Sequence, residues 1–325
     1  MTASRESTIG FALGPCDEMR AEVFLRATNP GAVGGQLVGT ITGPRRGRDT
    51  TLPTTTRLLP LPIEGMHDVP AARAVLTEPA YWTPDLPNLY RVEAVVERPR
   101  RLRPVVPPPG SSDQIDATVG LRRLGTRGRS FWLDGRRWVP RAVVVQGSPD
   151  LSSLKAATLA AALAAPGAEV LSAADEIGVA VLPIVRAVDV TADRISMLAR
   201  HPAATLAVVE TDTTADQSGP TEPQLAMLRS LKGTLLLGLT ANGSMPPPQT
   251  IAGVDFLVVV VPPGGLPHAA WREASSLPLV AWRRDTGDTG PSRAGCELLQ
   301  RDLAAWGLAA GVDRLPWDWA GYLVG

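Results

Sequence analysis

Three acidic side chains follow two apolar runs in the C-terminal part of the chain. Glu210 and Asp212 come after the run LAVV, and Asp285 comes after LVAW, with Arg283 and Arg284 in between. If both runs are strands of one parallel sheet, their carboxyl ends share an edge, where paired carboxylates can act as general acid, general base or nucleophile. Acids are also common in loops, so the same side chains fit solvated or helix-capping roles.

Other kinds of reactive centre have little support. Cys16 and Cys296 are far apart, and with histidines at 67, 201 and 268 they show neither a disulfide framework nor metal-ligand spacing. No Gly-x-Gly-x-x-Gly follows an apolar run, which argues against dinucleotide binding. The 32 basic residues balance 32 acidic ones, so no basic field favours nucleic acid. We expect no metal, no cofactor and no nucleic-acid partner.

Residues 20–100 read as short strands separated by turn residues. The segments RAEVFLRA (20–27) and YRVEAVV (90–96) alternate apolar and polar side chains, and no helical stripe of useful length interrupts them. This pattern predicts an antiparallel sandwich. The linking segment YWTPDLPNLY (81–90) is stiffened by two prolines, and we expect its aromatic side chains to fill one end of that sandwich.

From residue 137 the pattern changes to alternating strands and amphipathic helices, which indicates repeated β-α units. The predicted strands are 138–145, 159–164, 179–184, 205–209, 234–239, 256–261, 279–282 and 312–317. The predicted helices are 151–156, 168–177, 191–200, 222–231, 247–251, 267–274 and 293–308. Eight strands favour a closed barrel over an open doubly wound sheet.

Two expectations concern the surroundings of this barrel. Few residues follow Trp319, so the eighth helix is expected to be absent or supplied by something else. The apolar flank left uncovered would then suit a protein partner or an oligomer. Apolar runs are too short for a membrane span of about 20 residues. No secretory leader is evident, so a cytoplasmic location is expected.

Three stretches, in order along the chain, resemble the family 2 glycoside hydrolases. They are YWTPDLPNLYRVEAVV (81–96), VGLRRLGTRGRSFWLDGRRWVPRAVVV (119–145), and ADEIGVAVLP (174–183) with ARHPA (199–203). The resemblance implies an immunoglobulin-like β-sandwich over residues 1–125 and a (β/α)8 TIM-type barrel over residues 126–325. From these stretches we expect no counterpart of the family's N-terminal sugar-binding jelly roll within residues 1–325.

The resemblance also implies where catalytic groups should stand. Retaining glycoside hydrolysis uses two carboxylates roughly 5–5.5 Å apart, and in the family both are glutamates at the ends of barrel strands four and seven. Counting from His-Pro places the acid/base on Asp212, with Glu210 two residues early. The nucleophile position falls on Arg283, which cannot attack an anomeric carbon, and Asp285 is the nearest carboxylate.

Five further residues are candidates for contacts with a sugar. Gln146 follows strand one, and Trp317 and Trp319 are expected at the end of strand eight, where they either stack on a sugar or fill the barrel. Trp282 faces either the barrel mouth or the helix layer, opposite to Arg283. His201 fits a structural bond at a helix end better than proton transfer.

Two hypotheses follow. The favoured one is a non-catalytic, glycosidase-like protein that binds carbohydrate or serves as a scaffold. The alternative is an active retaining glycosidase that uses Asp212 or Glu210 as acid/base and a displaced carboxylate such as Asp285. An enzyme of another type on the same barrel also stays open, because a fold does not determine one function.

Overall fold

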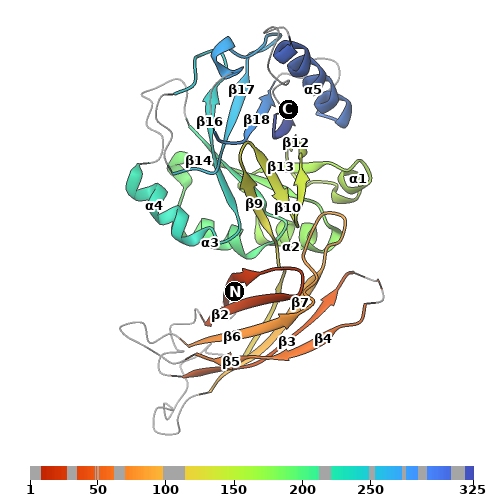
Figure 1. Cartoon of the computed structure of the whole chain (residues 1–325), viewed down its shortest axis with the longest axis vertical. Coiled ribbons are helices and arrows are strands. Elements are labelled where there is room, and N and C mark those ends of the chain that lie inside the picture. Colours follow the sequence, from red (N-terminus) through yellow and green to blue (C-terminus); the bar gives the residue numbers. More distant parts are fainter. Residues whose placement is uncertain are drawn as a thin grey trace. The chain divides into compact units, whose positions relative to one another are not determined.

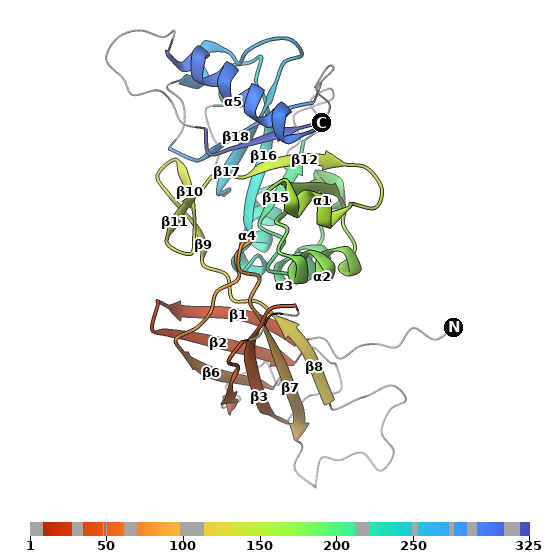
Figure 2. The same cartoon turned by 90° about the vertical axis from the view of Figure 1, so that its right-hand side faces the viewer.

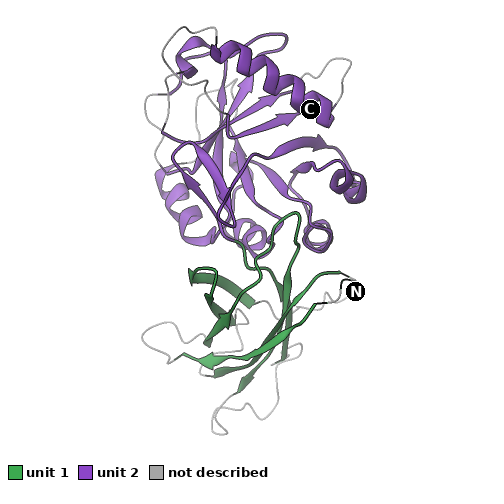
Figure 3. Ribbon diagram, turned by 45° about the vertical axis from the view of Figure 1, so that its right-hand side comes forward, with its two compact units in different colours: residues 1–122 green, residues 123–325 purple. Residues whose placement is uncertain are grey.

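A computed structural model describes residues 9–27, 35–47, 49, 51–61, 70–97, 114–211, 221–248, 253–272, 276–284, 291–308 and 319–325. The chain divides into two compact units, residues 1–122 and residues 123–325 (Figure 3). Each unit has its own strands and its own apolar core, and the two are described separately below.

The first unit is the expected β-sandwich. One antiparallel sheet has the order β1 (Ile9–Cys16), β2 (Arg20–Ala27), β6 (Ala71–Thr77) and β5 (Leu59–Pro60). The other has the order β4 (Thr54–Arg57), β3 (Gln36–Arg45), β7 (Leu89–Glu97) and β8 (Gln114–Val119). Figure 2 shows the two sheets of this unit. Alternate residues of β2 and β7 are buried, as their sequence alternation predicts, and both sheets contribute to one core.

The aromatic segment 81–90 packs as expected. Tyr81, Leu89 and Tyr90 belong to the sandwich core. The hydroxyl of Tyr90 accepts a hydrogen bond from the Ala80 N–H at 2.8 Å, and Asn88 Nδ2 donates to the Tyr81 carbonyl at 2.9 Å. These bonds hold the turn in one conformation, so its conspicuous sequence reflects packing.

The second unit contains a closed barrel of eight parallel strands (Figure 1). They are β12 (Arg141–Val145), β13 (Ala160–Ala164), β14 (Val181–Arg186), β15 (Leu206–Glu210), β16 (Leu236–Asn242), β17 (Phe256–Val261), β18 (Leu279–Arg283) and β19 (Gly321–Val324). The first seven strands overlap the predicted ones. The prediction for the eighth barrel strand was wrong, because β19 is the strand that closes the barrel between β18 and β12. Residues 312–317, where that strand was predicted, lie outside the described residues.

Five α-helices are described in this unit, and all five were expected. They are α1 (Leu151–Ala156), α2 (Ala168–Ile177), α3 (Ala192–Arg200), α4 (Glu222–Leu231) and α5 (Arg293–Leu308). Of the helix predicted at 267–274, only a 3-10 turn, η4 (Ala269–Arg272), is described; a second such turn is η3 (Ala187–Asp189). Of the range 247–251, where a helix was predicted, only residues 247 and 248 are described, and they are not helical; the rest of that prediction lies outside the described residues.

A small antiparallel sheet precedes the barrel and fills part of its interior. Its strands are β9 (Leu124–Arg127), β10 (Ser130–Leu133) and β11 (Arg136–Trp138). Phe131 of β10 lies in the inner core, with its ring edge-to-face on Phe256 at 5.4 Å. Gly238 makes room for Phe256, because a Cβ there would lie 2.3 Å from that ring.

Helix α5 covers the seam between strands eight and one. Cys296, Leu299 and Leu303 of α5 belong to one buried cluster with Tyr322 and Val324 of β19, and every residue of β19 is buried. The expectation of an exposed apolar flank was therefore wrong, because helix α5, which follows strand seven, also packs on β19 and β12.

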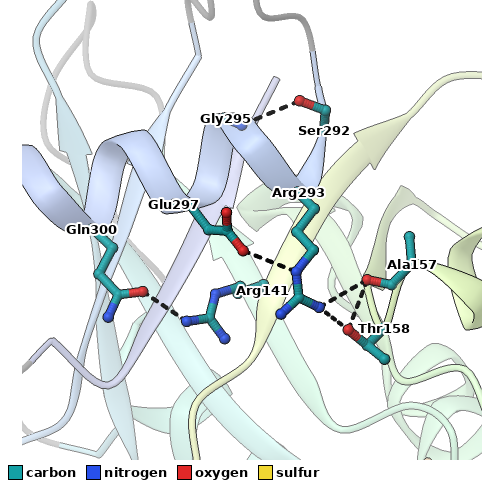
Figure 4. A network of polar contacts seen from close by, with 8 residues as sticks. All are labelled: Arg141, Ala157, Thr158, Ser292, Arg293, Gly295, Glu297 and Gln300. Atoms are coloured by element: carbon teal, nitrogen blue, oxygen red, sulfur yellow. Dashed lines mark hydrogen bonds and ion pairs between the residues drawn. The ribbon is translucent and has the colours of Figure 1, made fainter.

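Polar contacts position α5 over this seam (Figure 4). Arg141 Nη2 of β12 donates to Gln300 Oε1 at 2.7 Å. Arg293 donates through Nη1 to the Ala157 carbonyl at the C-terminal end of α1, at 3.0 Å, and through Nε to Glu297 at 2.9 Å. A guanidinium at a helix C-terminus is favourable because the terminal carbonyls have no partner within the helix. Among the described residues, no helix is long and apolar enough to cross a membrane.

We expect Trp306→Ala in α5 to destabilise the second unit by about 3–5 kcal/mol, because the indole is buried against Trp319 at 6.4 Å and under the Arg272 guanidinium at 4.5 Å. Leu308→Ala, at an exposed position of the same helix, should cost below about 0.5 kcal/mol. Urea unfolding measures both, and equal effects would contradict the packing described for α5.

We expect the Cys296 thiol to be inert in the folded protein. Burial raises its pKa to about 11 from an ordinary 9.0, which lowers the thiolate fraction near pH 8 about 100-fold. The folded state keeps this proton while the unfolded state loses it, so the free energy of unfolding should fall between pH 9 and 11. Thiol labelling of Cys16→Ser protein with and without urea checks the reactivity, and rapid labelling without urea would contradict it.

Candidate functional site

The carboxyl ends of the barrel strands form the mouth at which this fold places reactive groups. Glu210, at the end of β15, is the one acidic residue within the eight described barrel strands. Leu206 and Val208 belong to the inner core, and side chains alternate along a strand, so Glu210 points to the mouth.

Glu210 is paired with an arginine from the opposite side of the barrel. Arg284 Nη2 donates to Glu210 Oε1, joining the residues after strand seven to the end of strand four. The Arg284 guanidinium also lies over the Trp282 ring, 4.4 Å from its centroid. Trp282 faces the barrel interior and donates through Nε1 to the Gly325 carbonyl at 2.9 Å. The strand-four carboxylate therefore meets a cation across the mouth.

Arg283 points away from the mouth. Its Nη1 pairs with Asp302 Oδ2 of α5 at 2.8 Å, while its neighbour Trp282 lies in the inner core. The position matched to the family's nucleophile by counting thus faces the helix layer. A carboxylate at 283 with the same backbone would not reach the mouth, because adjacent strand residues face opposite sides.

Three candidates, Asp212, Asp285 and Trp317, lie outside the described residues, and their roles remain predictions. The residue before Asp212 is held in place: the Thr211 N–H donates to Thr240 Oγ1 at 3.0 Å, joining the ends of strands four and five. No group of three or more His, Cys, Asp or Glu side chains that could hold a metal occurs within the described ranges.

His201 lies at the opposite end of the barrel, before β15 begins. Its Nδ1 is 2.7 Å from Asp175 Oδ2, and Asp175 Oδ1 accepts the Ala203 N–H at 2.8 Å. Asp175 is buried, so these bonds offset the cost of removing its charge from water. His201 has the structural place that the sequence favours, but its partner is a carboxylate of α2, and it is far along the strand from the mouth.

Trp319 is also remote from the mouth. We expected it after strand eight, but it precedes β19 and is buried against Trp306 of α5, with ring centroids 6.4 Å apart. The expectation failed because strand eight begins after this tryptophan. In this place its ring packs beneath a helix and has no face available for a sugar.

Gln146 borders a cavity of about 500 Å³ at the ends of strands one to three. The described residues that line it are Val144, Val145, Gln146, Gly147, Pro149, Leu163, Ala164, Ala165, Pro166, Gly167, Val170 and Ile184. The apolar members were not singled out as site residues from the sequence. The segment ALAAP (162–166) was the sequence signal that could have identified them, because it has no polar side chain at the carboxyl end of a strand, where barrels often carry one.

Comparison with solved structures shows the same fold. A calcium-binding mutant of Bacteroides uniformis β-glucuronidase 2 has a TM-score of 0.61 at 15% identity, over 99% of this chain and 46% of that one. A β-D-glucuronidase of Dictyoglomus thermophilum has 0.63 at 13%, over 98% and 61%. A glycosyl hydrolase family 2 member from Bacteroides cellulosilyticus has 0.59 at 13%, over 97% and 45%.

This chain thus has the sandwich-and-barrel fold of family 2 glycoside hydrolases and spans about half the length of these proteins. No family model matches the chain. By sequence, no curated protein matches it either.

We expect Asp175→Ala to destabilise the second unit by about 2–4 kcal/mol, because it removes two hydrogen bonds made within the protein interior. Glu210→Gln should change stability by less than about 1 kcal/mol, because its partner Arg284 is half exposed and water screens their attraction. Chemical denaturation of both variants separates the structural carboxylate from the one at the mouth. A larger loss from Glu210→Gln would contradict these assignments.

Proposed function

We propose that this chain is a non-catalytic, glycosidase-like protein that acts as a carbohydrate-binding or scaffold module. The observation that carries the proposal is the ion pair of Glu210 with Arg284 across the barrel mouth. Retaining hydrolysis needs two carboxylates about 5–5.5 Å apart. Of the described residues at the end of strand seven, Arg283 faces the helix layer and Arg284 faces the mouth, and neither is a carboxylate.

The surroundings of the pair also support this proposal. Trp282 fills the interior beneath Arg284 and is 5% exposed, which limits access of a sugar ring to its face. A nucleophile would have to come from outside the described residues, as Asp285 would. The alternative is a retaining glycosidase with Asp212 or Glu210 as acid/base and Asp285 as nucleophile.

Hydrolysis assays separate these two functions. The structural neighbours are named as β-glucuronidases and a β-galactosidase, so 4-nitrophenyl β-D-glucuronide and β-D-galactoside are suitable substrates. We expect nitrophenol release from the purified chain to equal the rate without protein. Turnover that is lost in Asp212→Asn, Glu210→Gln or Asp285→Asn would overturn the proposal, whereas Glu222→Gln on α4 is a matched control away from the strand ends.

The two non-catalytic roles are separable on the same protein. Calorimetry with methyl β-D-glucuronide and methyl β-D-galactoside measures carbohydrate binding, and analytical ultracentrifugation measures self-association. Sugar binding that is weakened in Arg284→Ala supports a binding module at the mouth. Self-association without sugar binding supports a scaffold, and a monomer that binds neither sugar contradicts the proposal.

A further inference from the structure

The cavity at the ends of strands one to three has a composition unlike that of a sugar site. Among the described residues, its lining is apolar or glycine except for Gln146, and none of these residues is ionisable. A pyranose presents hydroxyl groups around its whole ring, and the few polar groups at this cavity could pair with only a minority of them, so the others would lose water without gaining a partner. The lining therefore selects against a sugar.

The backbone around this cavity is held in place. Ala165 has a left-handed conformation, with φ of 45°, which is unfavourable for a residue with a Cβ. Its N–H donates to the Ile184 carbonyl at 3.0 Å, so the loop after strand two is tied to the end of strand three. Pro149 restricts the loop after strand one, and Pro166 restricts the loop after strand two. A backbone strained at a cavity and held by such a bond is a feature of preformed binding sites.

The polar groups that border the cavity favour one neutral hydrogen-bonding group on the ligand. The Gln146 amide both donates and accepts hydrogen bonds. Helix α2 begins beside the cavity at Gly167, and the N–H groups of its first turn have no acceptor within the helix. The described lining holds no cation, and Glu169 in the first turn of α2 offsets the positive end of the helix dipole, so a carboxylate would gain no compensating charge there.

We propose that this cavity binds a small uncharged molecule with an apolar ring and one amide or hydroxyl group. The ring would pack among Val144, Leu163, Ala164 and Ile184, and the polar group would bond to the Gln146 amide. The volume of about 500 Å³ lies within the range of small-molecule sites. This site uses strand ends one to three, so it does not depend on the pair of Glu210 with Arg284.

Fluorescence titration with N-phenyl-1-naphthylamine, a neutral apolar dye, tests the site on the whole chain. We expect saturable enhancement that benzamide reverses and that benzoate and methyl β-D-glucoside leave unchanged. Enhancement that is absent, or that benzoate or the glucoside reverses as well as benzamide does, would overturn the proposal.

Two variants locate the site. Ala164→Phe should weaken dye binding about tenfold or more by filling the cavity, whereas Ala304→Phe on the exposed face of α5 should not. Gln146→Leu, at an exposed position, should leave dye binding intact and weaken benzamide about tenfold. If Ala164→Phe and Gln146→Leu both behave like Ala304→Phe, the ligand is bound elsewhere and the proposal fails. Because the assay follows dye and benzamide, glycoside turnover or its absence leaves this result unchanged.

Discussion

The second unit depends on the closure of its barrel by four residues. Strand β19 pairs with β18 on one side and with β12 on the other, and without it two strands would keep unpaired backbone groups. Closure brings apolar side chains of β19 to the outside, where α5 covers them. The contacts of Arg141 with Gln300 and of Arg293 with Ala157 are made across the same seam. Helix α5, which follows strand seven, thus covers both the last strand and the first strand of the barrel.

Closure also decides which side chains share the mouth. Because successive residues face opposite sides of a strand, Glu210 and Trp282 point inward while Arg283 pairs with Asp302 in the helix layer. The side chains that face inward make the two halves of the mouth chemically different. Strands four and seven carry an ion pair over a tryptophan, and strands one to three border an apolar cavity with Gln146 at its rim.

The motifs that carry the family resemblance act in folding. Asp175 and His201 belong to two separate landmarks of the sequence, yet they contact each other and tie α2 to the start of strand four. Tyr81 and Tyr90, from a third landmark, lie in the sandwich core. These residues serve the sandwich core and a helix–strand contact of the barrel, and the fold is shared with the structural neighbours compared at 15% identity or less.

The sequence alone determined the features that depend on residues close together along the chain. Alternation and helical periodicity identified seven barrel strands and the five α-helices, and the aromatic segment 81–90 was recognised as packing. Strand eight was misplaced because Gly321–Val324 is too short to show a period, and only pairing with β12 and β18 defines it. The direction of Arg283, the burial of Trp319 and the pairing of Glu210 with Arg284 required the tertiary structure, because each depends on residues brought together by barrel closure.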